Sequence, residues 1–442
     1  MMLILVLMAL LLFQVAFITN VAIVLASPSG GWIQTYGTET NKDRAESLIQ
    51  CTDGGYVIAG NTNVSTTPPR NQLWLLKTDA LGKMEWNKTY GSIGSAIGRC
   101  VIQTSDGGYA IAGTVNRVAE VVKIDSAGNI QWDRTFGEAA FAYFIIQTLD
   151  GGYALSGSTG GSGPSMGDNF WLIKIDSSGG SLWSKTYSQT SGSAASVIQT
   201  IDGGFAMIGS TQNSDFLLVK TNSQGIFEWS KTYGSEDMDA GYSIVQNPDG
   251  SFVMAGLLWN RTTFGEGSMG VGLVKADSAG NQLWLKNYPG SGSPSSMTHG
   301  SDGSYILCSS MLDKIDAGGN LIWSKNVSFD GIIGKDHAGT TYLAVQTSDG
   351  GYAVAGTVSS APSNPLNIIS YVWIGKLDSE GNKTAFIPEF SSVAILILVV
   401  IVCIVAVAFK KHLANVERNG NISSHQFLEM QVSHAFNPQN NL

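Results

Sequence analysis

The stretch "CVIQTSDGGYAIAG", residues 100–113, decides the fold because it is one of seven related copies. An apolar run leads into an Asp-Gly turn, and a second run follows in which large and small residues alternate, a pattern typical of a β-hairpin. The other copies begin at residues 47, 144, 196, 243, 296 and 343, and their turn aspartates lie 44 to 53 residues apart. A period of this length predicts an array of structural units rather than one single core.

Each copy continues in the same way, as "VVKIDSAGNIQWDRTFG" at 121–137 shows: an apolar run ends in Lys-x-Asp, a glycine turn follows, and a Trp comes next. We therefore predict four strands per repeat. The third is apolar on both faces, for example at 170–173, so each sheet should be covered on both sides. This predicts an all-β, seven-bladed β-propeller over residues 31–378. A β-solenoid has shorter repeats, and the unbroken period disfavours two tandem β-sandwiches.

The two ends of the repeat region complement each other. "GGWIQTYG" at 30–37 resembles a fourth strand that has no first three strands before it. The last copy ends at "YVWIGKLDSEGNK" (371–383), and no fourth-strand Trp follows it. We expect residues 31–37 to complete the sheet built by residues 342–378, which would close the ring and remove an exposed sheet edge.

Residues that recur in every copy are expected to have structural roles within the blade. The turn Asp should cap its turn, the Lys that ends the third strand should pair with a turn Asp, and the Trp should fill the space between blades. A Gln recurs in the first strand of six copies, and His299 takes its place in the remaining copy, which begins at residue 296. A binding site, by contrast, should break the repeat, because sites on propellers are normally asymmetric.

Composition and charge exclude some classes of protein. Charged residues make up 13% of the chain, aromatics make up 10%, and there are 53 glycines, which argues against disorder and fits a β-rich protein with many tight turns. Acidic side chains outnumber basic ones by 34 to 25, which disfavours nucleic-acid binding. Outside the apolar run at 390–409, which contains Cys403, cysteines 51, 100 and 308 are odd in number and scattered, so no disulfide framework is predicted. Before the second apolar segment, five N-x-S/T sites fit an exported, glycosylated surface: Asn63, Asn87, Asn260, Asn326 and Asn382.

Two apolar segments predict export and anchoring. Residues 1–26 carry no charge and end in a small-residue pattern that suits signal-peptide cleavage, with an uncleaved N-terminal anchor as the alternative. Residues 390–409 are long enough to form a transmembrane helix, although a buried globular helix is the alternative, and Lys410 and Lys411 indicate the cytoplasmic side. We therefore expect a cell-membrane protein with an extracellular propeller, a linker at 379–389 and a disordered cytoplasmic tail at 410–442.

The Trp turn, Asp-x-x-Gly-x-x-x-Trp, as in Asp125 to Trp132 and Asp277 to Trp284, resembles the tryptophan-docking motif of quinoprotein-type propellers. Its spacing is one residue shorter and no vicinal Cys pair is present, so no quinone cofactor is implied. The whole repeat region is more similar to propellers of archaeal and bacterial cell surfaces. "IPEFSS" at 387–392 is similar to archaeal anchoring tails that carry a Pro-Glu-Phe motif, although the long segment after the span departs from that pattern.

Candidate binding residues come from the places where the repeat breaks. The connections between second and third strands are long in four copies, and loops often carry function. One of them contributes Trp259 and Arg261, residue types that dominate contact energetics, although a loop Trp tucked against the blade is as good an interpretation. Acidic residues and one histidine gather between repeats: Asp43, Glu236, Asp239, Asp336 and His337. Carboxylates of this kind can hold Ca²⁺, but we expect solvated loop charge and predict no metal site and no cofactor.

No catalytic motif accompanies these features, so the leading hypothesis is a binding function. It would be adhesion, envelope organisation, or capture of a glycan or protein at the loop face of a membrane-anchored propeller. The alternative is a surface lyase or hydrolase that acts on polysaccharide. That alternative requires two carboxylates, or a His with a Tyr or Arg, close together over the central channel. A receptor that signals through its tail is a third and weaker hypothesis.

Overall fold

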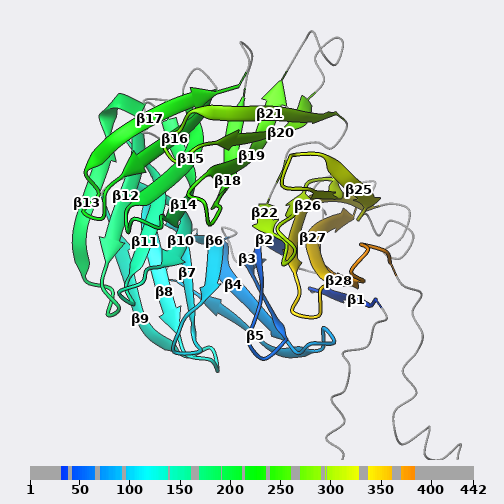
Figure 1. Ribbon diagram of the computed structural model, residues 1–442. Helices are drawn as coiled ribbons and strands as arrows, with labels where there is room; N and C mark the ends of the chain where they lie inside the picture. The colour runs from blue at the N-terminus through cyan, green and yellow to red at the C-terminus, as the bar shows by residue number, and fades with distance from the viewer. Residues whose placement is uncertain are drawn as a thin grey trace, which may run out of the picture. The chain divides into compact units, whose positions relative to one another are not determined.

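In the computed structural model the chain is described over residues 31–37, 42–64, 70–91, 96–137, 140–160, 169–190, 192–211, 215–234, 239–259, 269–289, 294, 296–327 and 337–383 (Figure 1). The predicted signal segment and the predicted transmembrane helix at 390–409 lie outside these ranges. Among the described residues, no helix has the length and apolar character needed to cross a membrane.

Seven antiparallel sheets of four strands make up the described structure, and each sheet corresponds to one predicted blade. We number the blades along the chain. Blade 1 contains β2 (Arg44–Gln50), β3 (Tyr56–Val64), β4 (Arg70–Thr78) and β5 (Met84–Tyr90). Blade 2 contains β6 (Ala96–Gln103), β7 (Tyr109–Val115), β8 (Val118–Ile124) and β9 (Ile130–Phe136). Blade 3 contains β10 (Ala140–Gln147), β11 (Tyr153–Thr159), β12 (Asn169–Ile175) and β13 (Ser181–Tyr187), and the short 3-10 helix η1 (Ser188–Thr190) follows it.

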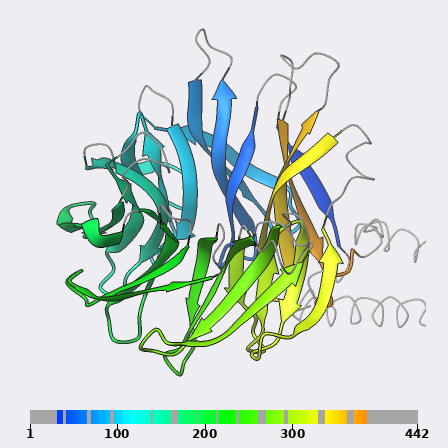
Figure 2. The same ribbon diagram turned by 90° about the horizontal axis from the view of Figure 1, so that it is seen from above.

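The remaining blades repeat this order. Figure 2 shows the blades following one another in chain order, from blue through green to orange. Blade 4 contains β14 (Gly192–Gln199), β15 (Phe205–Thr211), β16 (Phe216–Thr221) and β17 (Phe227–Tyr233). Blade 5 contains β18 (Ala240–Gln246), β19 (Phe252–Trp259), β20 (Met269–Ala276) and β21 (Gln282–Pro289). Blade 6 contains β22 (Ser296–His299), β23 (Tyr305–Cys308), β24 (Met311–Ile315) and β25 (Leu321–Asn326). Blade 7 contains β26 (His337–Gln346), β27 (Tyr352–Ser360), β28 (Ser370–Leu377) and β1 (Ile33–Tyr36).

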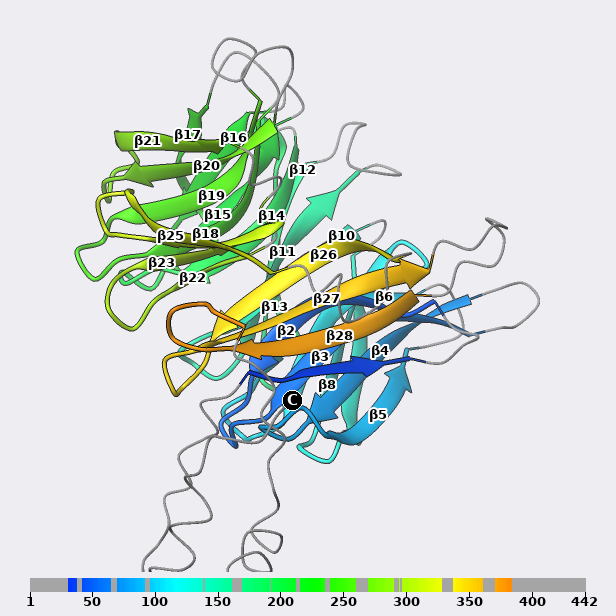
Figure 3. The ribbon, with the colours of Figure 1, turned by 90° about the vertical axis from the view of Figure 1, so that its right-hand side faces the viewer.

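The first strand of the chain closes the ring, as predicted. β1 pairs with β28 from Ile33 opposite Gly375 to Tyr36 opposite Val372, and the two strands lie side by side in Figure 3. The amide of Lys376 also donates a hydrogen bond of 2.8 Å to the carbonyl of Trp32. Each blade contacts the next, and β2 of blade 1 contacts both β6 of blade 2 and β26 of blade 7. The prediction of a seven-bladed propeller closed by an N-terminal strand is confirmed.

The hydrophobic core lies between the blades rather than inside any one of them. It consists of seven apolar clusters, and each cluster draws its side chains from two neighbouring sheets. The closure interface has such a cluster too, in which Tyr36 and Ile374 of blade 7 pack with Ile58 and Trp74 of blade 1. Burial on both faces explains why the third strand of most repeats is largely apolar up to its recurring Lys.

The recurring polar residues hold the turns together, as predicted. In blade 1 the Asp53 carboxylate accepts a hydrogen bond of 2.8 Å from the Gly55 amide, and Gly54 before it adopts a φ of 84°, a value that favours glycine. The buried Lys77 ammonium lies 2.9 Å from the same carboxylate. Equivalent pairs join Lys123 to Asp106, Lys174 to Asp150, Lys220 to Asp202, Lys314 to Asp302 and Lys376 to Asp349.

The recurring Trp and Gln residues join neighbouring blades. Trp32 packs edge-on against Tyr56 of the next blade, with ring centroids 5.8 Å apart, and covers the turn glycine Gly82 of that blade so closely that a side chain there would clash. The Gln side chains form a second belt, in which the carbonyl oxygen accepts a hydrogen bond from a turn amide of the preceding blade. The bond from the Ser348 amide to Gln50, at 2.8 Å, carries this belt across the closure interface.

Candidate functional site

One position of the repeat is built to face the axis of the ring. In blades 1 to 5 the innermost strand contains a β-bulge seven residues before the turn Asp, where two residues oppose one on the neighbouring strand. A bulge redirects a side chain that would otherwise follow the regular alternation of the strand. The bulged residues are Glu46, Arg99, Tyr143, Ala195 and Tyr242.

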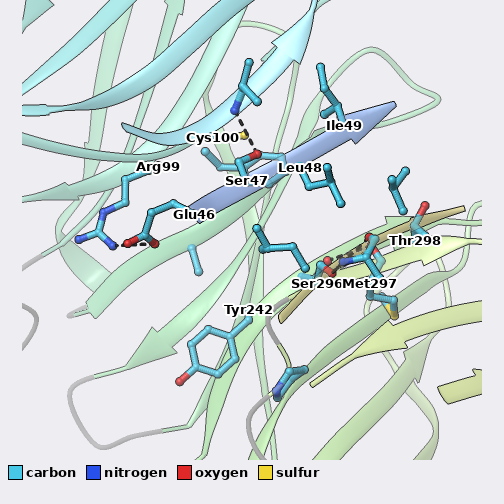
Figure 4. Close-up of a pocket in the computed structure, with 18 of the residues that line it drawn as sticks. Glu46, Ser47, Leu48, Ile49, Arg99, Cys100, Tyr242, Ser296, Met297 and Thr298 are labelled. Carbon is cyan, nitrogen blue, oxygen red and sulfur yellow. Dashed lines mark hydrogen bonds and ion pairs between the residues drawn. The ribbon is translucent and has the colours of Figure 1, made fainter. Parts of the chain in front are cut away.

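All five bulged side chains line one cavity of about 860 Å³. Figure 4 shows three of them, Glu46, Arg99 and Tyr242. Residues of the innermost strand of every blade contribute to its wall, so it lies where the seven sheets converge. The volume falls in the range of small-molecule sites, which are concave and carry a few well-placed polar groups. It is the place in the described structure where all seven copies meet.

The bulge position breaks the repeat, whereas the positions around it do not. A carboxylate, a guanidinium, two phenols and a methyl group occupy it in blades 1 to 5. In blade 7 the bulge moves two residues earlier, to Thr340 between Gly339 and Thr341. A residue type needed only for folding would be the same in each copy, as the turn Asp is. The variation therefore marks this ring of side chains as the candidate functional site.

An ion-pair network occupies one side of the cavity. The Glu46 carboxylate lies 2.9 Å from the Arg44 Nε and 3.6 Å from an Arg99 Nη of the next blade. Glu46 is 12% exposed, whereas the Arg99 side chain is 38% exposed and lines the cavity next to Glu46 (Figure 4). Glu46 and Arg99 are the charged residues among the described residues of the lining.

Two tyrosines provide the aromatic part of the lining. The Tyr143 hydroxyl is 3.3 Å from the Ser158 hydroxyl, which fixes the orientation of the ring. Tyr242 is 38% exposed, and burial around its hydroxyl raises its pKa above the usual value, so the phenol is protonated at neutral pH. Blades 2 and 5 are three positions apart, the largest separation in a ring of seven, so Arg99 and Tyr242 approach the cavity from different sides.

Blade 6 contributes short strands and a short connection to the cavity wall. The connection from β23 to β24 is only two residues long, Ser309 and Ser310, and both residues belong to the lining. Ser296 of β22 lines the cavity as well, and its hydroxyl donates to the carbonyl of Ala344 in blade 7. The short sheet thus adds small polar groups to the lining of the cavity.

Two of the residues predicted from sequence are buried at the joints between blades. Asp43 is 4% exposed, its amide donates to the carbonyl of Ser370 at 3.2 Å, and burial raises the pKa of its carboxyl group above the usual value. Asp239 is 1% exposed, and its carboxylate packs against Gly234, the residue that follows β17. Within the described ranges, no group of three or more His, Cys, Asp or Glu side chains is placed to hold a metal ion.

The other predicted residues are not brought into the cavity by the part of the chain that is described. Trp259 is the last residue of β19 and His337 the first of β26, and their side chains are outside the described structure. Arg261, Glu236 and Asp336 lie outside the described residues altogether. The residues predicted from sequence lie where the loops between strands and between repeats break the repeat. The signal for the bulged residues lies inside the first strand, seven residues before the turn Asp, where the copies differ in sequence.

The fold and the axial cavity together define a β-propeller with a candidate ligand site at its centre. Solved structures of the same fold include virginiamycin B lyase from Staphylococcus aureus, as a catalytically inactive variant with quinupristin, at a TM-score of 0.52 and 12% identity over 78% of this chain and 99% of that one. A streptogramin B lyase structure is similar at a TM-score of 0.50 and 13% identity, over 79% of this chain and 98% of that one. At these identities the likeness concerns the fold alone. No protein-family model matches the chain, and no curated protein matches it in sequence.

Proposed function

We propose that this protein is a ligand-binding β-propeller that captures its ligand in the axial cavity. The observation that supports it is the bulge position, where Glu46, Arg99, Tyr143, Ala195 and Tyr242 differ from blade to blade while the scaffold residues around them recur. Aromatic and arginine side chains at the centre of a concave surface supply most of the binding energy in protein interfaces. The proposal moves the site from the predicted loops to the inner wall of the ring.

The proposal also places the propeller outside the cell, anchored in the membrane by residues 390–409 and exported by residues 1–26, with the C-terminus in the cytoplasm. The support for this part is the sequence: two long apolar segments flank the repeat, and a Lys pair follows the second one. Adhesion, envelope organisation and capture of a glycan or protein all fit such a location.

Binding is preferred over the alternative of a polysaccharide-cleaving enzyme. Glycosidases of the two-carboxylate type need two acidic side chains that flank the scissile bond. Among the described residues of the lining there is one carboxylate, Glu46, and it is already paired with two arginines.

The test is to fill the cavity at Ala195, the smallest of the five bulged residues. The full-length chain is expressed in cells, recovered in carbonate-washed membranes, extracted in detergent and screened on arrays of glycans and peptides. We expect retention in the washed membranes, binding by the wild-type chain, and loss of that binding in Ala195→Trp with an unchanged melting temperature.

The matched control is Gln282→Trp, which adds the same side chain at an exposed position of β21 and should bind as the wild type does. Full binding by the Ala195→Trp chain would overturn the cavity as the site. Release of the chain by the carbonate wash would overturn the anchoring.

A further inference from the structure

The charges around the cavity do not cancel. Arg44 lies closer to the Glu46 carboxylate than Arg99 does, at 2.9 Å against 3.6 Å, so one guanidinium is enough to neutralise that carboxylate. Two guanidinium groups then face one carboxylate, and a positive charge remains beside the cavity. Within the described part of the chain, no second carboxylate lines the cavity to balance it. An anionic ligand is therefore favoured over a neutral or cationic one.

The Arg99 guanidinium can bind such a ligand because its contact with Glu46 leaves its N–H donors available. Its 3.6 Å contact with Glu46 is longer than a hydrogen bond, and it makes no hydrogen bond to any other described residue. The side chain is 38% exposed, so its fork of N–H donors is open to the cavity. That fork matches the two oxygens of a carboxylate in a bidentate arrangement.

The remaining groups favour a ligand with a flat apolar face and many hydroxyls. Tyr242 presents a large aromatic surface at 38% exposure, and Tyr143 adds a second ring from blade 3. The axial C–H groups of a pyranose ring form an apolar face that packs on such a ring, while its hydroxyls need polar partners. Ser296 and Ser309 of blade 6, next to Tyr242 in the ring, provide hydroxyl groups of this kind.

We propose that the axial cavity binds an acidic sugar, a uronate unit of a glycan, with its carboxylate on Arg99 and its pyranose ring against Tyr242. This inference rests on the proposed function, because it names the ligand class of the same cavity. Glu46 is a positioning residue that holds the guanidinium toward the cavity. The volume of about 860 Å³ leaves room for more than one sugar unit.

The test uses calorimetric titration of the detergent-solubilised full-length chain with three probes: digalacturonate, its methyl ester, and the neutral galactose disaccharide. The ester keeps the shape of the acid but removes its charge. We expect binding of digalacturonate at least about tenfold tighter than that of either neutral probe, the effect of losing one charge-assisted bidentate contact. In Arg99→Gln this preference should disappear, whereas Arg134→Gln, the same change on the outer strand β9 of the same blade, should keep it.

Two tyrosine variants test the stacking. Tyr242→Ala should weaken binding of all three probes about equally, and Tyr242→Phe should bind as the wild type does, because the ring rather than the hydroxyl makes the contact. Equal affinity for the acid and its ester, unaffected by Arg99→Gln, would overturn the uronate inference and leave the cavity as a binding site.

A peptide with a free C-terminal carboxylate serves as a fourth probe. If it binds through Arg99 and digalacturonate does not, the glycan assignment is wrong and the proposed function stands. If no probe binds and Ala195→Trp also fails to change the binding found on the arrays, both proposals fail.

Discussion

At the scale of single residues, the turn aspartates stabilise each repeat through local hydrogen bonds and ion pairs. The Asp150 carboxylate accepts a hydrogen bond of 2.6 Å from the Thr148 hydroxyl, which is the largest cause of a pKa lowered to about 2. Desolvation opposes this shift, and the Lys174 ammonium adds to it. Because the folded pKa lies below that of the unfolded chain, the pair stabilises the fold above about pH 4 and loses that effect as the pH falls toward 2.

The corresponding prediction concerns Asp150→Asn. At pH 7 this variant should unfold with a free energy lower than that of the wild type by on the order of 1 kcal/mol, a modest value because Asp150 is largely exposed and solvent screens the pair. The difference should shrink toward zero between pH 4 and pH 2, and thermal unfolding of the full-length chain over this range measures it. Thr148→Val should move the acid transition to higher pH, and a difference independent of pH would contradict the assignment.

At the scale of elements, the seven interfaces between blades are not equal. In six of them a Gln of the first strand accepts a hydrogen bond from a turn amide of the preceding blade, for instance Gln199 from Leu149 at 2.9 Å. Between blades 5 and 6 the turn residue is Pro248, which has no N–H to donate, and the Gln is replaced by His299. Trp284 packs on the cluster that contains Tyr305, but the ring contact described for Tyr305 there is with His299 of its own blade, at 5.4 Å between centroids.

The missing hydrogen bond between blades 5 and 6 can be introduced by substituting both residues. Pro248→Thr supplies the amide and His299→Gln supplies the acceptor, so only the double variant can form the belt hydrogen bond. A double-mutant cycle in thermal or urea unfolding should give a coupling energy of about 1 kcal/mol in favour of the double variant. Gln199→His, which breaks the same bond between blades 3 and 4, should destabilise the chain by a similar amount. Additive effects in the cycle would show that the two substitutions do not form this hydrogen bond between blades 5 and 6.

At the scale of the whole molecule, ring closure gives the interface between blades 7 and 1 the same contacts as the interfaces between blades that are consecutive in the chain. Trp32 packs against Tyr56 at 5.8 Å across the closure, and Trp132 packs against Tyr153 at 6.0 Å between blades 2 and 3. Trp32→Ala and Trp132→Ala should therefore cost a similar free energy of unfolding, roughly 3 kcal/mol each, although one residue lies near the start of the described chain.

Unfolding of both full-length variants in urea measures this prediction, and deletion of residues 31–37 extends it. The deletion leaves β28 as an unpaired edge and should lower the stability more than either substitution. A much smaller effect for Trp32→Ala than for Trp132→Ala would mean that the ring does not depend on its closing strand.

The sequence by itself determined the number of blades, the strand order within each and the closing role of residues 31–37. These features rest on contacts within one copy, such as the Asp53 turn, or on contacts repeated identically between neighbours, such as the Trp and Gln belts. A pattern that recurs seven times reports them without knowledge of the fold.

Only the tertiary structure decided where the site lies. Glu46 and Tyr242 are 196 residues apart in sequence, and they line the same cavity because the innermost strands of blades 1 and 5 each carry a bulge at this position. The same geometry buries Asp43 and Asp239 at the joints, although both belong to polar connections in the sequence. Side chains from seven copies share one cavity only when the ring is closed, so no single repeat contains the information that they are neighbours.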